Sequence, residues 1–238
     1  MTLAHPETLA KTLDDRAEQG VLLLHGHSRT GRSMGKLSAR LQAAGFRTWA
    51  PTYSFRAPLP QVVDRLLPEL AAFKRTFAGP LHIVAHSLGS LVARALVVRQ
   101  RPQPLGRVVM LAPPNGGSEW ADALSRLRLN RLALGAMAPQ MLTARSADDE
   151  ALLGPVDFEL GIIAGDRALD PILPRLILPH PHDGKVSVAA TRIAGMSDHV
   201  VLPVTHTLMI FNPRVGDQVL AYLGTGRFLG DDVTRRTA

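Results

Sequence analysis

Residues 81–99 read LHIVAHSLGSLVARALVVR, and this stretch decides the expected fold. Its first part, Leu81–Ala85, is a short, continuous apolar run, which is typical of a strand buried on both faces of a sheet. Its second part repeats apolar residues at helical spacing and predicts a helix from Leu88 to Arg99. Ser87 stands on the turn between them. A strand that leads directly into a helix indicates a parallel sheet with crossover helices.

The same rhythm continues on both sides of this unit. Further strands are expected at residues 21–25, 46–50, 107–111, 158–164 and 199–204, with helices at 34–44, 59–77 and 214–223. This alternation predicts an α/β fold, with a mostly parallel sheet of about six strands flanked by helices. A chain of 238 residues fits one domain that spans residues 1–238.

One stretch breaks the rhythm. Residues 115–155 contain no strand signal and carry leucines and methionines among arginines. We interpret residues 118–155 as a mostly helical cap or lid inserted within the single domain.

Composition narrows the classes of function. The formal charge of +7 comes almost entirely from arginines, but they are scattered, and aromatic residues are only 5% of the chain. A nucleic-acid partner is therefore not expected. Without cysteine there is no disulfide, thiolate nucleophile or thiolate metal site. The cluster His180-Pro181-His182-Asp183 matches no familiar metal spacing, so no metal is expected either.

The location of the protein is predicted from two absences. The first twenty residues have no apolar core of signal-peptide length, and no apolar run approaches the length of a membrane-spanning helix. A cytoplasmic protein with no integral membrane segment is the expectation. The role of residues 1–20 is left open beyond a short helix packed against the sheet.

The turn Ala85-His86-Ser87-Leu88-Gly89 is the strongest chemical signal. A serine between a strand and a helix projects its hydroxyl from the carboxyl edge of the sheet, and small residues on either side allow strand and helix to pass closely. The first amides of the helix, Leu88 N–H among them, can stabilise a developing oxyanion. The alternative is a structural serine that caps the helix.

These residues resemble the nucleophile turn of the α/β-hydrolase superfamily, in particular that of bacterial lipases and esterases. The family pattern is G-x-S-x-G, and here Ala85 takes the first place. Leu24-His25-Gly26-His27 resembles the family's oxyanion loop, which implies that the backbone N–H of His27 is the second oxyanion donor. The resemblance covers residues 21–223 and implies an α/β-hydrolase fold.

A rival interpretation uses the same loop. Gly26–Ser33 matches a phosphate-binding loop, G-x-x-x-x-G-K-[ST], except that Arg32 replaces the lysine. A guanidinium is a poor substitute for that compact ammonium, and no convincing metal-binding Asp follows another strand. Nucleotide binding therefore stays a remote alternative.

The order Ser, acid, His in the superfamily implies a base near the C-terminus. His206 follows an apolar run and precedes the last expected helix, whereas His199 heads the strand itself. Asp183, in a D-G-x-V stretch, resembles the family's acid, and Asp166 is the runner-up because it directly follows a strand. Asp170 and Asp198 were weaker candidates.

The expected function is a serine carboxylic ester hydrolase of the lipase or esterase type. Ser87 would be the nucleophile, His206 the base and Asp183 the acid, with the N–H groups of His27 and Leu88 as the oxyanion hole. No cofactor is implied. The partner would be a small-molecule or lipid acyl ester, and thioester or amide hydrolysis and acyl transfer are alternatives. Chain length of the substrate, movement of the cap and oligomeric state stay open.

Overall fold

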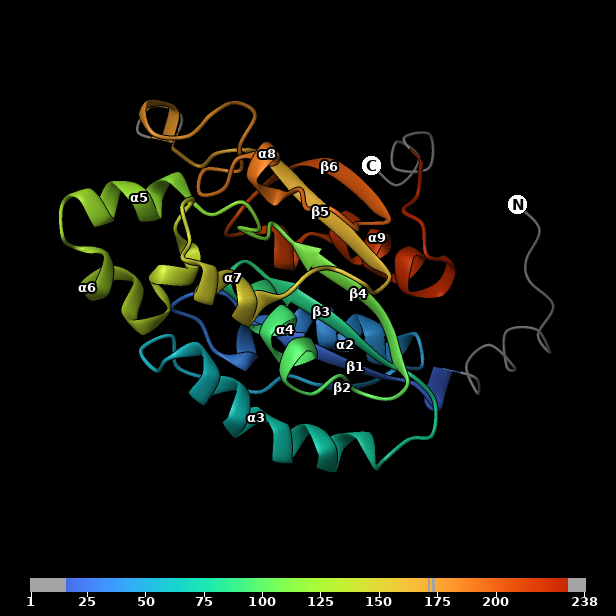
Figure 1. Cartoon of the computed structure of the whole chain (residues 1–238). Coiled ribbons are helices and arrows are strands. Elements are labelled where there is room, and N and C mark those ends of the chain that lie inside the picture. Colours follow the sequence, from blue (N-terminus) through green and yellow to red (C-terminus); the bar gives the residue numbers. More distant parts are fainter. Residues whose placement is uncertain (1–15, 171, 173, 231–238) are drawn as a thin grey trace.

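The computed structural model describes residues 16–170, 172 and 174–230, and its centre is a six-stranded sheet (Figure 1). The strand order is β2-β1-β3-β4-β5-β6, and every neighbouring pair is parallel. The strands are β1 (Gly20–Leu24), β2 (Arg47–Trp49), β3 (Leu81–His86), β4 (Leu105–Leu111), β5 (Leu160–Arg167) and β6 (Asp198–Thr205). The predicted α/β fold with a parallel sheet is confirmed.

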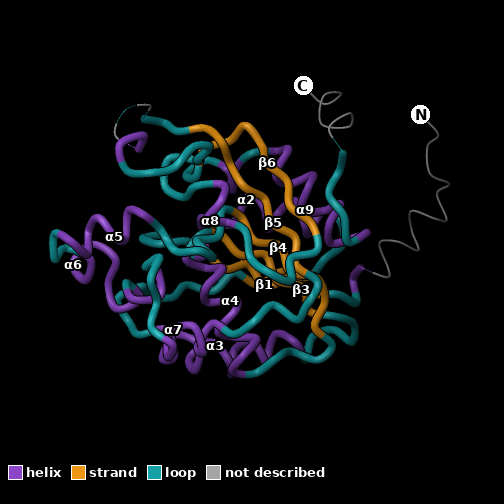
Figure 2. Tube along the Cα trace, turned by 45° about the horizontal axis from the view of Figure 1, so that its top comes forward, coloured by secondary structure: helices purple, strands orange, loops and turns teal. Residues whose placement is uncertain are grey.

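Helices cover both faces of the sheet (Figure 2). The helices α2 (Gly35–Ala43) and α9 (Pro213–Thr225) pack in one apolar cluster, while α3 (Leu59–Lys74) and α4 (Leu88–Arg99) pack in the other. Successive residues of β1 alternate between the two clusters: Leu22 belongs to one and Leu23 to the other. This is the side-chain alternation of a strand that is buried on both faces.

The remaining helices are short and lie in the segments that connect the strands and the longer helices. Those between β4 and β5 are α5 (Glu119–Arg126), α6 (Asn130–Leu134), η2 (Gly135–Met137), η3 (Pro139–Met141) and α7 (Ala147–Leu153). The others are η1 (Gly31–Met34), η4 (Pro174–Leu176), α8 (Val188–Thr191) and η5 (Met209–Phe211). The helical character of residues 118–155 was predicted without bounds for its single helices, whereas η1, η4, α8 and η5 were not predicted, because stretches of three or four residues are too short for a periodic sequence signal.

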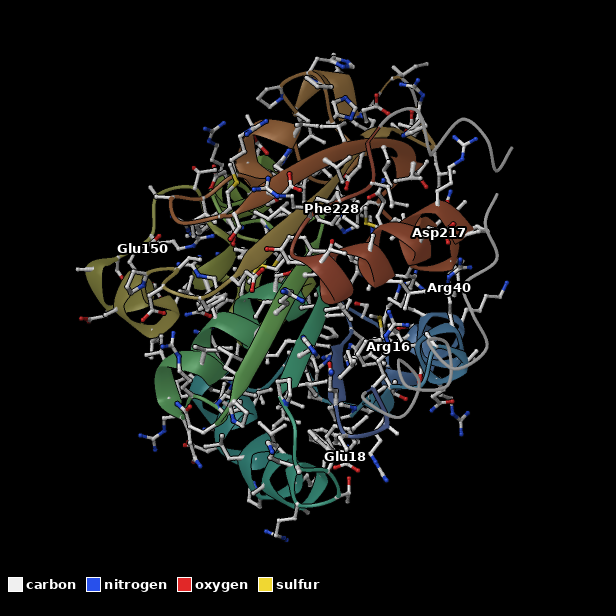
Figure 3. All side chains as sticks on the ribbon, turned by 90° about the vertical axis from the view of Figure 1, so that its right-hand side faces the viewer. Arg16, Glu18, Arg40, Glu150, Asp217 and Phe228 are labelled. Carbon is white, nitrogen blue, oxygen red and sulfur yellow. The ribbon has the colours of Figure 1, made fainter. Side chains whose placement is uncertain are left out.

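Ion pairs join several of these elements at the surface. Arg40 of α2 pairs with Asp217 of α9, which ties together the two helices on one face (Figure 3). Arg107 of β4 pairs with Glu159 just before β5, with 2.9 Å between Nε and Oε1. Half-exposed pairs of this kind contribute little to stability, typically under about 1 kcal/mol each.

All six strands end at the same edge of the sheet, because they are parallel. The loops that follow β1, β3, β4, β5 and β6 therefore gather at this carboxyl edge, where ligands bind in open α/β sheets. The helices α5 and α6 project from one end of the molecule, away from the faces covered by α2, α3 and α9 (Figures 1 and 2). The expected helix in residues 1–20 falls mostly on residues 1–15, which lie outside the described residues.

Candidate active site

Ser87 sits on the turn between β3 and α4 in a strained backbone conformation. Its φ is 53° and its ψ is −124°, a combination that residues other than glycine rarely adopt. Its N–H donates to the carbonyl of Leu111 at 2.8 Å, which anchors the turn to β4. Although Ser87 is the N-cap of α4, its side chain makes no capping hydrogen bond. The hydroxyl is therefore not used to cap the helix.

Two glycines allow the loop after β1 to pass beside this turn. A Cβ on Gly89 would lie 2.6 Å from the carbonyl oxygen of Leu24, closer than real Cβ contacts. A Cβ on Gly26 would lie 2.8 Å from His86 Nδ1 and 3.2 Å from Ser87 Cβ. The spacing of glycines in HG and S-x-G thus follows from close backbone approach, and it places His27 next to the serine.

A chain of two hydrogen bonds runs from Ser87 into the protein. His206 Nε2 lies 2.9 Å from Ser87 Oγ, and His206 Nδ1 lies 2.7 Å from Asp183 Oδ2. The three residues are at most 6% exposed. They come from three separate loops at the carboxyl edge, and they are 119 and 23 positions apart in sequence.

The carboxylate of Asp183 is fixed by its own loop. Its Oδ1 accepts hydrogen bonds from the N–H groups of Lys185 at 2.9 Å and Val186 at 2.8 Å, and its carbonyl accepts from His206 N–H at 3.0 Å. A carboxylate accepts hydrogen bonds only, so His206 Nδ1 carries the hydrogen. The lone pair of Nε2 is then left facing the hydroxyl of Ser87.

The other candidates from the sequence lie in different surroundings. Asp166 pairs with Arg167 at 3.2 Å, and Asp198 accepts from the N–H groups of His199 and Phe228. Asp170 accepts from Ile172 N–H at 2.8 Å. His199 shares a 2.9 Å hydrogen bond with Thr191 Oγ1. Nδ1 of His206 is hydrogen-bonded to Asp183. Asp166, the runner-up acid, is therefore not in the position that the acid of a triad requires.

His25 holds the loop after β1 in place. Its Nδ1 donates to the carbonyl of Gly26 at 2.9 Å, its Nε2 accepts from Tyr53 N–H at 3.2 Å, and its ring stacks on Tyr53 at 4.0 Å. Burial lowers the pKa of His25. The neutral ring thus positions the backbone that leads to His27.

His86 is a second supporting histidine that the sequence indicated only as part of the turn. Its Nε2 donates to the carbonyl of His206 at 3.1 Å, and the two rings lie 5.0 Å apart. Burial, followed by the nearby charge of His206, lowers the pKa of His86 well below its ordinary value. A neutral His86 therefore helps to hold the backbone of His206. A histidine directly before the turn serine was the only sequence signal for this role.

A cavity of about 340 Å³ opens beside Ser87. Ser87, His86, His206 and the loop residue His27 line one side of it. Most of its apolar lining comes from the segment between β4 and β5, and Val186 of the Asp183 loop adds to it; the residues of that segment are Pro114, Trp120, Ala121, Leu124, Leu134 and Met141. Trp120 Nε1 donates to the carbonyl of Gly184 at 3.3 Å, which joins α5 to the loop of Asp183.

Metal-ligating clusters and membrane-spanning helices are both absent from residues 16–170, 172 and 174–230. In this part of the chain, no three His, Asp or Glu side chains come together as a group that could hold a metal ion. Within the same residues, none of the helices combines the length and apolar character that crossing a membrane requires.

Comparisons with solved structures identify similar folds. The mature form of a Bacillus licheniformis lipase, BlEst2, superposes with a TM-score of 0.73 at 14% identity, covering 95% of this chain and 96% of that one. A metagenomic carboxyl esterase gives a TM-score of 0.66 at 16% identity, covering 81% and 66%. The phospholipase PlaB from Legionella pneumophila gives 0.59 at 17%, covering 79% and 53%.

Sequence comparison gives the family. A search of curated protein sequences found no match. The family profile described as "Alpha/beta hydrolase family" matches residues 21–223, from the first strand of the sheet to the last helix. The chain belongs to the alpha/beta hydrolase family.

Proposed function

We propose that this protein hydrolyses carboxylic esters through an acyl-enzyme formed on Ser87. The observation that carries the proposal is the buried chain of hydrogen bonds from Ser87 Oγ through His206 to Asp183. A hydroxyl is a weak nucleophile until an adjacent base accepts its proton, and an acid behind that base fixes its tautomer. Ser87 has no capping role that would explain its strained position otherwise.

The reaction follows from these positions. Ser87 Oγ attacks the ester carbonyl carbon while its proton passes to His206 Nε2. The bond to the alcohol then breaks, and His206 returns the proton to the leaving alkoxide. Water repeats the sequence on the acyl-enzyme and releases the acid. Asp183 stabilises the imidazolium that forms in each half of the cycle.

The oxyanion hole is assigned to two backbone amides. Leu88 N–H is at the start of α4, where helix amides have no intrahelical acceptor, and His27 N–H belongs to the loop that passes beside Ser87. One such donor is typically worth about 3–4 kcal/mol in the transition state.

The segment 118–155 is proposed to be a cap that shapes the substrate cavity and acts as a lid. It supplies the apolar wall beside Ser87, and it exposes leucines on its outer side. Leu127 is 67% exposed and Leu132 is 78% exposed, and the arginines Arg126, Arg128 and Arg131 lie between or beside them. Exposed leucines among cations favour adsorption to a lipid surface, and hence a lipase.

The similar structures support the same class of substrate. Their names are those of a lipase, a carboxyl esterase and a phospholipase. Transfer of an acyl group to an alcohol, and hydrolysis of thioesters or amides, use the same nucleophile and remain alternatives. Nucleotide binding by Gly26–Ser33 loses support, because Gly26 is folded against Ser87 and the space above the loop belongs to the ester cavity.

A series of 4-nitrophenyl esters from acetate to palmitate, with and without detergent micelles, tests the proposal. We expect a burst of nitrophenol equal to the amount of enzyme, followed by steady turnover, and no turnover by Ser87→Ala. Turnover that survives in Ser87→Ala, or turnover of ATP with magnesium in place of esters, would contradict it. A rate that rises at micelles indicates a lipase, and one that is independent of them indicates an esterase.

A further inference from the structure

The cavity beside Ser87 has an uneven distribution of charge. Arg29 and Lys185 line it, and among the described residues that line it none is an Asp or Glu. Within that described part of the chain, neither cation takes part in an ion pair. Arg29 Nη2 donates instead to the carbonyl of Thr207 at 3.4 Å.

At another cavity of the molecule, the cations that line the wall are ion-paired. A cavity of about 540 Å³ at the amino end of the sheet is lined by Arg101 and Arg107, and both are paired with carboxylates of the same wall, Asp157 and Glu159. A cation in a partly desolvated wall is costly without a counter-charge. At the cavity beside Ser87, Arg29 is half-buried with no counter-charge among the lining residues, and Lys185 is exposed, so an anionic ligand would supply the counter-charge that Arg29 lacks.

Arg29 lies on the side of the cavity where the alcohol leaves, and Lys185 lies where the Asp183 loop meets α5, since its neighbour Gly184 accepts from Trp120. His206 gives its proton to the leaving alkoxide, so the alcohol part of the ester faces the imidazole. Arg29 is bonded to Thr207, the residue after His206, and Lys185 follows the acid Asp183 by two positions. The apolar wall of α5, α6 and η3 is left for the acyl chain.

We propose that the site takes esters with an apolar acyl chain and an alcohol part that carries an anion, held by Arg29 and Lys185. This inference rests on the function proposed above. The anion is a phosphate or a carboxylate. A guanidinium and an ammonium that line the same cavity suit both groups, because the first can bind two oxygens at once and the second acts as a compact charge.

The electrostatics of the buried site agree with this placement. After burial and the neighbouring His206, the charges of Arg29 and Lys185 contribute to the lowered pKa of His86. His86 lies directly beside the nucleophile. Both cations are therefore close enough to His86 to act on its charge.

Three octanoyl esters that differ only in the alcohol test the proposal: octanoyl glycerol, octanoyl glycerol phosphate and the octanoyl ester of glyceric acid. We expect kcat/KM to be higher for one or both anionic esters than for the neutral one, and the preferred anion tells phosphate from carboxylate. In the double variant Arg29→Gln/Lys185→Gln, the ratio of anionic to neutral kcat/KM falls by roughly tenfold or more. The control Arg65→Gln/Arg75→Gln removes two exposed cations, one in α3 and one at its C-cap, that do not line the cavity, and it keeps the ratio.

An unchanged ratio in Arg29→Gln/Lys185→Gln, or a wild-type preference for the neutral ester, would overturn the inference while leaving ester hydrolysis intact. Failure of the proposed function is recognised separately, as absence of turnover with all three esters. In that case calorimetry with octyl phosphate decides the anion site. If octyl phosphate binds to Ser87→Ala and no longer binds when Arg29→Gln/Lys185→Gln is added, the anion site is supported. If octyl phosphate does not bind to Ser87→Ala, the anion site is contradicted.

Discussion

A buried histidine stands at each end of β3, and the two differ in their hydrogen bonding. At the amino end of β3, His82 is satisfied at both ring nitrogens, by Gln19 Oε1 at 2.9 Å and by Arg107 N–H at 2.8 Å. At the carboxyl end, His86 Nδ1 has no hydrogen-bond partner among the described residues, and Ser87 is strained.

The cations repeat this contrast. Those that line the amino-end cavity are paired with carboxylates, and those that line the carboxyl-end cavity are not. Satisfied buried groups contribute to stability, whereas strained or unpaired ones persist where the surrounding fold holds them for another purpose. We infer from this difference in hydrogen bonding and ion pairing that groups at the amino end stabilise the fold, whereas groups at the carboxyl end interact with a ligand. Changes at one end should therefore affect activity, and changes at the other should affect stability.

The largest effect is expected from Asp183→Asn at the carboxyl end. An amide in place of the carboxylate presents a donor to His206 Nδ1 and favours the wrong tautomer, so kcat for a 4-nitrophenyl ester should fall by about 10⁴-fold. Asp166→Asn is the matched control, because Asp166 is the runner-up acid, lies near the carboxyl end of β5 and pairs with Arg167. Equal losses in the two variants, measured by steady-state kinetics, would show that the acid is misassigned.

A smaller effect is expected from Gly26→Ala. The new methyl group would lie 2.8 Å from His86 Nδ1 and 3.2 Å from Ser87 Cβ, so the loop that carries His27 N–H must move. Displacement of one oxyanion donor should lower kcat by roughly 100- to 1000-fold. Gly35→Ala is the control, since a Cβ there meets nothing within 4 Å. If Gly26→Ala keeps the wild-type kcat, the assignment of His27 N–H to the oxyanion hole is wrong.

At the amino end, His82→Gln should change the pH dependence of stability and leave activity in place. Burial lowers the pKa of His82 to about 4, against 6.5 as the ordinary value. Between these values the unfolded chain binds a proton that the folded chain does not, so the free energy of unfolding decreases as the pH falls from 6.5 to about 4. This histidine alone accounts for on the order of 3 kcal/mol of that decrease.

Urea unfolding at several pH values measures this contribution. The decrease between pH 6.5 and about 4 should be smaller in His82→Gln than in the wild type, and unchanged in the control His180→Gln, whose side chain is exposed. The same slope in both variants would mean that His82 is not the buried neutral group inferred here. A loss of activity in His82→Gln at pH 7 would contradict the expectation that changes at the amino end affect stability and not activity.

The smallest effect is expected on the outer side of the cap. Leu127→Ser/Leu132→Ser replaces two exposed leucines that do not line the cavity. Activity on a micellar long-chain ester should fall several-fold, by about 1 kcal/mol of lost adsorption, while activity on a soluble acetate stays the same. Val201→Ser, an exposed position on β6, is the control. Equal activity on micelles would favour an esterase with a fixed cap.

The framework could be predicted from sequence because its strands are buried on both faces. All five residues of β1 and all six of β3 are buried, and such strands leave continuous apolar runs. The helix after Ser87 was predicted with the bounds that the structure has, 88–99. Strand ends differ from the prediction by up to three residues, because they depend on pairing with neighbours rather than on local composition.

The candidate site was predictable only in part. The positions of Ser87 and His206 follow from the order of elements, but the choice of Asp183 over Asp166 depends on a loop that its own hydrogen bonds to Lys185 and Val186 shape. Sequence also could not tell which cap leucines face the cavity, as Leu124 does, and which face solvent, as Leu127 does. Both outcomes depend on how distant segments pack.

Labelling with a fluorophosphonate, followed by peptide mass spectrometry, tests the role of Ser87 most directly. This reagent bonds to a serine only when a neighbouring base has made its oxygen nucleophilic. The expected result is one adduct per chain, on Ser87, that is lost in Ser87→Ala and strongly slowed in His206→Ala. An adduct on another serine, or labelling of Ser87 that does not depend on His206, would contradict the proposed mechanism.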